Sequence, residues 1–112
     1  MLAMLLFWSC TTSVDDWESF VREHSKAQCL VYKKCHRSFF DGEYETIGRC
    51  EEEQMEDWVD LQSNLYSGCT FLVDQAQICL ERTYSSTCGE HWNEQDSIYQ
   101  SCHDELWSCS VD

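Results

Sequence analysis

The sequence predicts a small all-α protein, a bundle of three to four helices that disulfide bonds hold together. Its 112 residues include nine cysteines, and so high a cysteine content in a short chain is typical of a disulfide-rich scaffold. The apolar residues recur every three or four positions, which is the period of an amphipathic helix and not of a strand. No repeat or linker divides the chain, so we expect residues 14–112 to form one cysteine-rich helical domain.

Residues 1–13 are predicted to be a secretory signal peptide. A short apolar run precedes a group of small residues, and cleavage after Ser13 suits that pattern. The run comprises Leu2, Leu5, Leu6, Phe7 and Trp8. Cleavage there removes Cys10 and leaves eight cysteines, the even number that four intramolecular disulfides require. Two alternatives stay open: residues 1–10 begin a buried helix whose Cys10 pairs between chains, or Cys10 is lipidated as in a bacterial lipoprotein.

The remaining cysteines are expected to form four disulfides, which indicates an oxidising, extracellular compartment. They are Cys29, Cys35, Cys50, Cys69, Cys79, Cys88, Cys102 and Cys109. A domain of about a hundred residues buries only about two thirds of its unfolded surface, so its core alone is modest. Each unstrained disulfide contributes roughly 2–4 kcal/mol, and four could match the net stability of a typical domain. We therefore expect a secreted protein.

The first helix is predicted from Val14 to about Arg37. Ser13 stands three residues before Asp16, a spacing typical of a helix start. One side of the helix carries the apolar residues Trp17, Phe20, Val21, His24, Val31, Tyr32 and Cys35. The pair Asp41-Gly42 is expected to form the turn that follows the helix.

The second predicted helix, at residues 51–82, is the longest and is expected to be the centre of the fold. Three acids stand at its start, where the helix dipole favours negative charge. Its apolar stripe comprises Met55, Trp58, Val59, Leu65, Tyr66, Cys69, Leu72, Val73, Ala76, Cys79 and Leu80. Gly68 is expected to bend or interrupt the helix. Phe71 and Ile78 fall on the opposite side, which predicts that neighbours cover this helix from two directions.

A third helix is predicted at residues 94–108, after a loop at residues 84–93. Trp107 is expected to project away from the side of this helix that carries Ile98 and Leu106. An exposed tryptophan is a favoured anchor at protein interfaces, so Trp107 is a candidate partner-binding residue. The alternative is that another segment covers it.

The helical positions of four cysteines constrain their pairing. Cys102 and Cys109 are seven residues apart and therefore face the same way. They cannot easily bond to each other, because a disulfide needs α-carbons within about 7 Å. Cys29 lies off the apolar side of the first helix and Cys35 lies on it. We therefore expect Cys102 and Cys109 each to tether their helix to a neighbour, and Cys29 and Cys35 to bond to different elements.

The charge of the chain is large and unevenly distributed. Its formal net charge is −14, which repels nucleic-acid phosphates and anionic membranes and favours cationic partners. Five of the seven bases nevertheless lie between residues 22 and 37. Four of them fall within a narrow arc of the first helix and form a predicted basic ridge: Arg22, Lys26, Lys33 and Arg37. The ridge is a candidate docking surface for a partner protein. The alternatives are that water covers it or that it pairs with Glu52, Glu53, Glu56 and Asp60.

Metal and catalytic sites are not expected, and neither is a cofactor. The histidines and cysteines lack the paired spacing of zinc ligands, and no calcium loop of the EF-hand type can be written. The stretch "CGEHWNEQDSIYQSCHDELWSC" resembles the secreted phospholipase A2 pattern, in which a Cys-Gly calcium loop precedes a helix with a His-Asp pair. The resemblance implies that His103 is a general base and that Asp104 helps to hold calcium. The adjacent cysteines of that family are missing here.

The stretches "CLVYKKC" and "CLERTYSSTC" and the wide cysteine spacing resemble the con-ikot-ikot-type conotoxins. They also resemble cysteine-rich helical domains of unknown function in secreted nematode and mollusc proteins. The resemblance implies a channel or receptor as the target. We expect a secreted, non-enzymatic ligand, toxin-like or pheromone-like, that binds an extracellular protein without inserting into a membrane. The alternatives are an acidic matrix protein that binds calcium collectively and a degenerate phospholipase A2-like protein.

Overall fold

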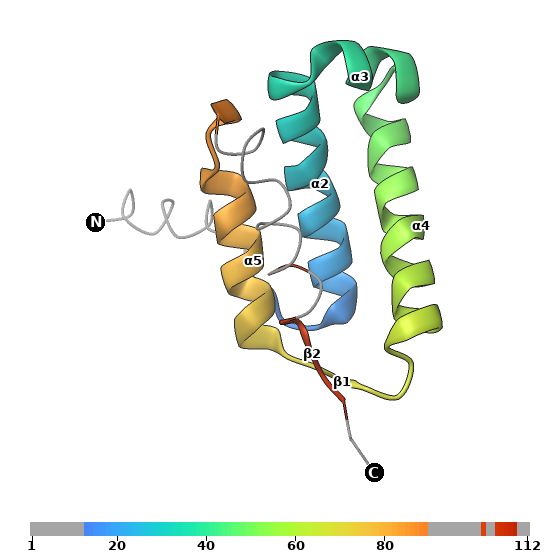
Figure 1. The fold of residues 1–112 in the computed structure, drawn as a ribbon, viewed down its shortest axis with the longest axis vertical. Coiled ribbons are helices and arrows are strands. Elements are labelled where there is room, and N and C mark those ends of the chain that lie inside the picture. Colours follow the sequence, from blue (N-terminus) through green and yellow to red (C-terminus); the bar gives the residue numbers. More distant parts are fainter. Residues whose placement is uncertain (1–12, 90–101, 103–104, 110–112) are drawn as a thin grey trace, which may run out of the picture.

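The computed structural model describes residues 13–89, 102 and 105–109, which form a mostly helical fold stapled by four disulfides (Figure 1). The predicted all-α class is confirmed. In chain order the elements are α2 (Trp17–Cys35), α3 (Arg37–Glu43), α4 (Ile47–Leu65), β1 (Thr70–Phe71), α5 (Val73–Ser85) and β2 (Trp107–Ser108). The predicted signal peptide, Cys10 included, lies outside the described residues apart from Ser13.

Helix α2 begins at a reciprocal cap. The Asp16 carboxylate accepts the backbone N–H of Ser19 at 2.8 Å, and the Ser19 hydroxyl accepts the backbone N–H of Asp16 at 3.0 Å. Each side chain thus satisfies an amide that the first turn of a helix leaves without a partner. The sequence had indicated Ser13 as the capping residue, which is wrong by about one turn. The observed cap is Asp16, and Ser19 is its partner in the reciprocal pair.

The connection from α2 to α4 differs from the predicted turn. Asp41 and Gly42 lie inside α3, and the chain reverses at Glu45, whose φ is 67°. Thr46 then caps α4, with its hydroxyl accepting the backbone N–H of Arg49 at 3.2 Å. The predicted Asp-Gly turn fails because the backbone N–H of Tyr44 bonds to the Phe40 carbonyl at 2.9 Å and continues the helix.

The predicted helix at residues 51–82 is two helices. Helix α4 ends at Leu65, a connection containing Gly68 follows, and α5 starts at Val73, so the interruption expected at Gly68 is confirmed. The connection includes β1, which pairs antiparallel with β2 in a ribbon that places Thr70 opposite Ser108. The predicted helix at 94–108 is therefore wrong at its end, since Trp107–Ser108 is a strand. The rest of that prediction falls mainly on residues that the structure does not describe.

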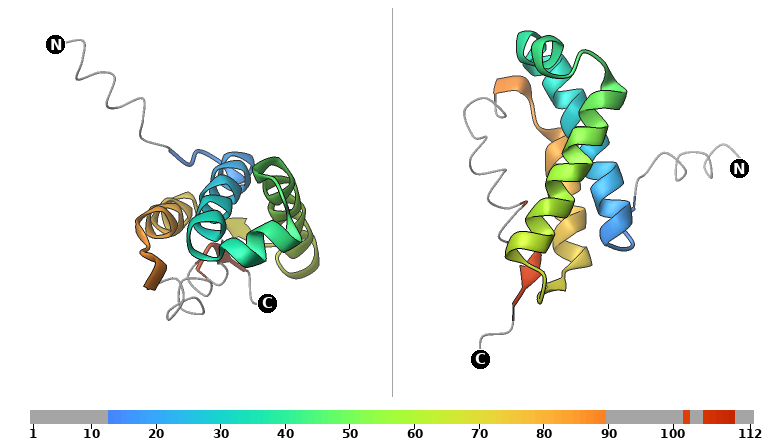
Figure 2. Two further views of the ribbon diagram at one scale, coloured as in Figure 1. Left: turned by 90° about the horizontal axis from the view of Figure 1, so that it is seen from above. Right: turned by 90° about the vertical axis from the view of Figure 1, so that its right-hand side faces the viewer.

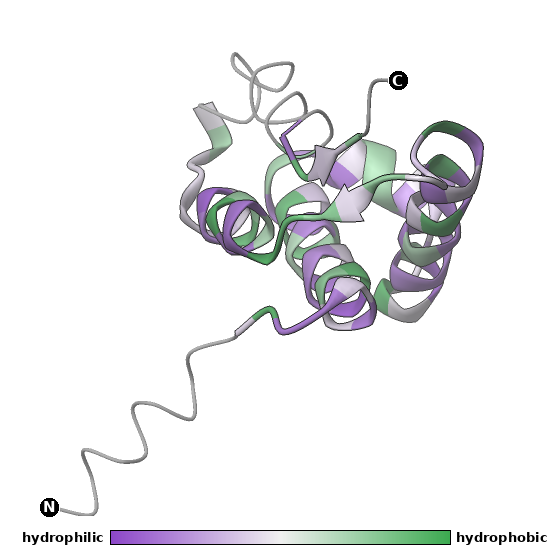
Figure 3. Cartoon of the chain, turned by 90° about the horizontal axis from the view of Figure 1, so that it is seen from below, coloured by the Kyte–Doolittle hydropathy of each residue, from purple (hydrophilic) through white to green (hydrophobic). Residues whose placement is uncertain are grey.

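Helix α2, and not the predicted second helix, is the centre of the described fold. It lies between α4 and α5 and contacts both, while α3 crosses one end (Figures 1 and 2). The helices are amphipathic, and each carries both hydrophobic and hydrophilic residues (Figure 3). Ile78, expected to be covered, is 49% exposed. None of the helices in the described part of the chain combines the length and apolar content that crossing a bilayer requires.

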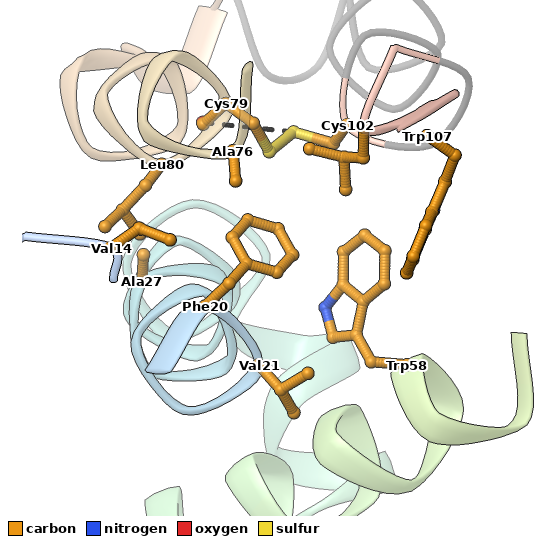
Figure 4. Packing of buried hydrophobic residues seen from close by; sticks show 11 residues of the cluster. Val14, Phe20, Val21, Ala27, Trp58, Ala76, Cys79, Leu80, Cys102 and Trp107 are labelled. Carbon is orange, nitrogen blue, oxygen red and sulfur yellow. Dashed lines mark hydrogen bonds between the residues drawn. A yellow bond between two sulfur atoms is a disulfide. The ribbon is translucent and has the colours of Figure 1, made fainter. Parts of the chain in front are cut away.

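The buried apolar residues form two clusters. The larger joins α2, α4 and α5, and Figure 4 shows Phe20 and Trp58 close together near the Cys79–Cys102 disulfide. Its buried members are Val14, Phe20, Val21, Ala27, Trp58, Ala76, Cys79, Leu80, Cys102, Leu106 and Trp107. The smaller cluster lies where α2, α3 and α4 meet and comprises Cys29, Phe40, Tyr44 and Cys50. Burial of Trp58, and of Trp17 in part, agrees with the sequence.

All eight predicted cysteines are bonded, in the pairs Cys29–Cys50, Cys35–Cys88, Cys69–Cys109 and Cys79–Cys102. Cys102 and Cys109 do not bond to each other, as expected, and each bonds to another segment; the expectation that Cys29 and Cys35 bond to different elements is confirmed. The Cys69–Cys109 bond lies directly beside the Thr70–Ser108 pair and continues its register. Its α-carbons are 4.3 Å apart, the spacing of a non-hydrogen-bonded antiparallel pair.

Candidate functional site

A buried polar chain at His24 is the most concentrated chemistry in the described core. The Trp58 indole N–H donates to His24 Nδ1 at 3.1 Å. Because an indole nitrogen can only donate, Nδ1 carries a lone pair, and the proton of the neutral ring is on Nε2. His24 Nε2 lies 3.3 Å from the Thr83 hydroxyl, which itself donates to the Cys79 carbonyl at 3.0 Å. The donors and acceptors therefore run in one direction from α4 through α2 to α5.

This cluster does not fit a metal ion, although its ligand atoms are close together. One ring nitrogen of His24 and the sulfurs of Cys79 and Cys102 lie within 4.8 Å of one another. A metal needs deprotonated thiols and a nitrogen lone pair. Here the two sulfurs are bonded to each other, and the Nε2 that faces Thr83 carries the proton. The cluster instead fixes the positions of three helices, since a buried polar chain with paired groups specifies one arrangement of a core.

Trp107 is buried, so its predicted role as an exposed anchor is wrong. Only 8% of the residue is exposed. Its ring stacks on Tyr66 at 5.2 Å between centroids and lies 4.9 Å from the ring of Trp17 and 5.3 Å from that of Phe71. The strand register causes this, because β2 places Trp107 directly opposite Phe71. The predicted alternative, that another segment covers Trp107, describes the structure.

The predicted basic ridge is present on α2 with three of its four members. Arg22, Lys26 and Lys33 are exposed, and both Arg22 and Lys26 approach the Glu23 carboxylate, at 3.6 and 3.5 Å. Arg37 does not continue the ridge, since α2 ends at Cys35. Arg37 begins α3 instead and pairs with Asp41 there at 3.2 Å.

Leu30 and Lys34, which were not part of the predicted ridge, complete this surface. Leu30 is 53% exposed, and it lies one helical turn after Lys26 and one before Lys34. We call the exposed side of α2 the basic face, and it comprises Arg22, Lys26, Leu30, Lys33 and Lys34. The available signal was an apolar residue, Leu30, placed four residues after Lys26 and four before Lys34. It was missed because a mainly charged helix side was interpreted as charge alone.

The acidic side of α4 carries a shallow groove of about 460 Å³, and we call it the α4 groove. The described residues that line it are Glu52, Met55, Glu56, Val59 and Asp60. Within the described residues no ion pair joins these carboxylates to the basic face. The predicted alternative of pairing between the two helices is therefore not what the structure has there. On α4 itself, Arg49 pairs with Glu53 at 3.6 Å.

Negative charge accumulates beside the α4 groove. Partial loss of solvent raises the pKa of Asp57, and repulsion from Asp60 and Glu53 raises it further. Desolvation is the larger cause, and the repulsion shows that Asp57, Asp60 and Glu53 lie close enough to act on one another. Several carboxylates are therefore concentrated on this side of α4, and Arg49 pairs with one of them, Glu53.

The residues of the phospholipase A2-like pattern, His103 and Asp104 among them, lie outside the described part of the chain. No protein-family model, curated protein or solved structure matches this chain. The resemblances to phospholipase A2 and to the conotoxins therefore rest only on short stretches and cysteine spacing in this sequence.

Proposed function

We propose that the protein is a secreted, non-enzymatic binding protein that engages an extracellular protein through the basic face of α2. The observation that carries the proposal is Leu30, an exposed apolar side chain among four cations. Such a centre, apolar and bordered by charge, is the composition of an interface in which apolar burial provides affinity and charge provides orientation. The partner would be an acidic receptor or channel surface, and the ligand would be toxin-like or pheromone-like.

The rigidity of α2 supports this role. Its other sides are buried against α4 and α5, and the Cys29–Cys50 and Cys35–Cys88 bonds tie its C-terminal half to the rest of the fold. A surface that is already ordered loses less conformational entropy when it binds. The basic face would therefore meet a partner as a preformed helix.

Local charge, and not net charge, would decide the encounter. At physiological salt the Debye length is about 8 Å, so distant carboxylates are largely screened. At contact distance an acidic partner would meet mainly Arg22, Lys26, Lys33 and Lys34. Secretion is part of the proposal, and the four disulfides are consistent with an extracellular protein.

The test is saturable binding of the labelled protein to cells of the source organism. We expect Lys26→Glu with Lys33→Glu to reduce binding at least about tenfold, because each reversal replaces attraction with repulsion. Leu30→Ser should also weaken binding. Trypsin treatment of the cells should abolish it, since the proposed receptor is a protein. The thermal unfolding midpoint should fall only slightly, because all three residues are exposed and the lost Lys26–Glu23 ion pair and helix-end charge contribute about 1 kcal/mol or less each.

The matched control is Arg49→Glu with Arg82→Glu, which changes the net charge equally at other exposed positions. This double variant should retain wild-type binding. An equal loss of binding in both double variants would show that only the net charge matters, and the basic face would then have no specific role.

A further inference from the structure

We infer that the α4 groove docks a basic amphipathic helix of a partner protein, at a site separate from the basic face. The groove combines two features that such a helix would recognise. Its carboxylates offer ion pairs to lysine and arginine, and the side chains of Met55 and Val59 offer apolar contact between them. This is the helix-in-groove mode of recognition, in which apolar positions provide burial and charged borders fix the register.

The spacing of the lining residues suits a helix. Glu52, Glu56 and Asp60 recur every four residues and thus form a row along α4. Their span of eight residues is about 12 Å, or roughly two helical turns. Met55 is half-buried and borders the larger core cluster, while Val59 is 49% exposed. A partner helix could therefore lay two turns along this row and cover Val59.

The charge of the occupant follows from what surrounds the groove. In the described residues the nearest base on α4, Arg49, is already engaged with Glu53. The repulsion that Asp57 experiences from Asp60 and Glu53 would be relieved by an incoming cation. A second copy of this chain, whose basic face also carries cations, is the competing occupant, and the oligomeric state distinguishes it. A basic helix would supply cations to the carboxylates of the groove and would relieve the repulsion at Asp57.

The probe is a synthetic helical peptide of about 18 residues, roughly five turns, made of alanine, leucine and lysine. Its leucines lie on one side and its lysines border them, and a scrambled peptide of the same composition is the matched ligand control. Fluorescence anisotropy at about 0.15 M salt, where distant charges are screened, measures the affinity of the full chain. We expect the amphipathic peptide to bind at least about tenfold more tightly than the scrambled one.

Protein variants separate the groove from general acidity. Glu52→Gln with Glu56→Gln and Asp60→Asn should weaken peptide binding about tenfold. The same number of charges removed elsewhere, by Glu43→Gln, Glu81→Gln and Glu105→Gln, should have little effect. Val59→Ser should weaken binding about fivefold because it removes apolar burial without changing charge. Ile78→Ser is its control, since Ile78 is also 49% exposed.

Three results would overturn the inference. Equal affinity for the scrambled peptide would mean that net charge alone attracts it, and so would a Val59→Ser variant that binds as tightly as wild type. A wild-type dimer in sedimentation that Glu56→Lys dissociates would assign the groove to a second copy. Lys26→Glu with Lys33→Glu should leave peptide binding intact, so a failure of this inference and a failure of the proposed function are distinguishable.

Discussion

The indole of Trp58 on α4 donates a hydrogen bond to His24 Nδ1 on α2 at 3.1 Å, and both side chains are buried. Their rings also meet edge to face, with centroids 5.1 Å apart. The two residues are 34 positions apart in the sequence, and their contact joins the two helices. It makes one polar bond a specific determinant of how α4 packs on α2.

Replacement of Trp58 by phenylalanine is expected to lower the free energy of unfolding by about 2 kcal/mol. Phenylalanine retains an aromatic ring but leaves His24 Nδ1 without its donor in a buried site, which has a desolvation cost. Urea unfolding followed by circular dichroism measures the change. Trp17→Phe is the control, since Trp17 is only half-buried. A Trp58→Phe variant no less stable than Trp17→Phe would contradict the importance of this hydrogen bond.

Glu45 occupies the left-handed region with φ of 67°, where a side chain costs roughly 1–2 kcal/mol. Glu45→Gly should therefore stabilise the protein by about 1 kcal/mol, although glycine also gains entropy in the unfolded chain. Differential scanning calorimetry should show a higher melting temperature. Glu45→Ala separates the backbone from the charge and should give no increase. A rise in both variants would point to the removed carboxylate instead.

Acid should weaken the start of α2. The backbone hydrogen bond from Ser19 holds the pKa of Asp16 below its ordinary 3.8. A lowered folded pKa means that this stability is present above the unfolded value and is lost as the pH falls through the folded value. Asp16→Asn retains a capping oxygen at every pH. Melting temperatures of the two proteins should agree near about pH 6 and diverge below pH 3.8, with wild type the lower.

Asp57 should have the opposite effect at neutral pH. Its pKa is raised above 3.8, chiefly by desolvation and then by Asp60 and Glu53. Ionisation of such a group reduces stability as the pH rises through the folded pKa, and below the unfolded value the cost is absent. Asp57→Asn should therefore be more stable than wild type at pH 7, with the difference vanishing in acid. A constant difference across the titration would indicate a cause other than ionisation.

The disulfides should differ in their resistance to reduction. Exchange requires that a thiolate reach the sulfur, and Cys109 is exposed while its partner Cys69 is half-buried. The Cys29–Cys50 and Cys79–Cys102 bonds are buried. Limited reduction with alkylation and peptide mass spectrometry should therefore find Cys69 and Cys109 labelled first. In denaturant this order should disappear, and its persistence there would mean that burial does not cause it.

Local sequence was informative wherever a feature depends on neighbours within one or two turns. The apolar period predicted α2 to within a few residues, the cysteine content indicated the stapled helical class, and Trp58 and His24 were both placed among the inward residues. The predicted ridge was correct for Arg22, Lys26 and Lys33, because all three belong to one helix.

Distant contacts decided the rest. An interruption near Gly68 was predicted locally, but the strand that follows it and the burial of Trp107 depend on a pair whose members, Phe71 and Trp107, lie 36 positions apart along the chain. A repeat of apolar residues reveals which side of a helix turns inward, but it carries no information about the segment that will cover it. The sequence by itself therefore determined a helical, disulfide-rich, acidic protein. Only the tertiary structure decided which surfaces remained open, because burial is a property of two segments and periodicity is a property of one.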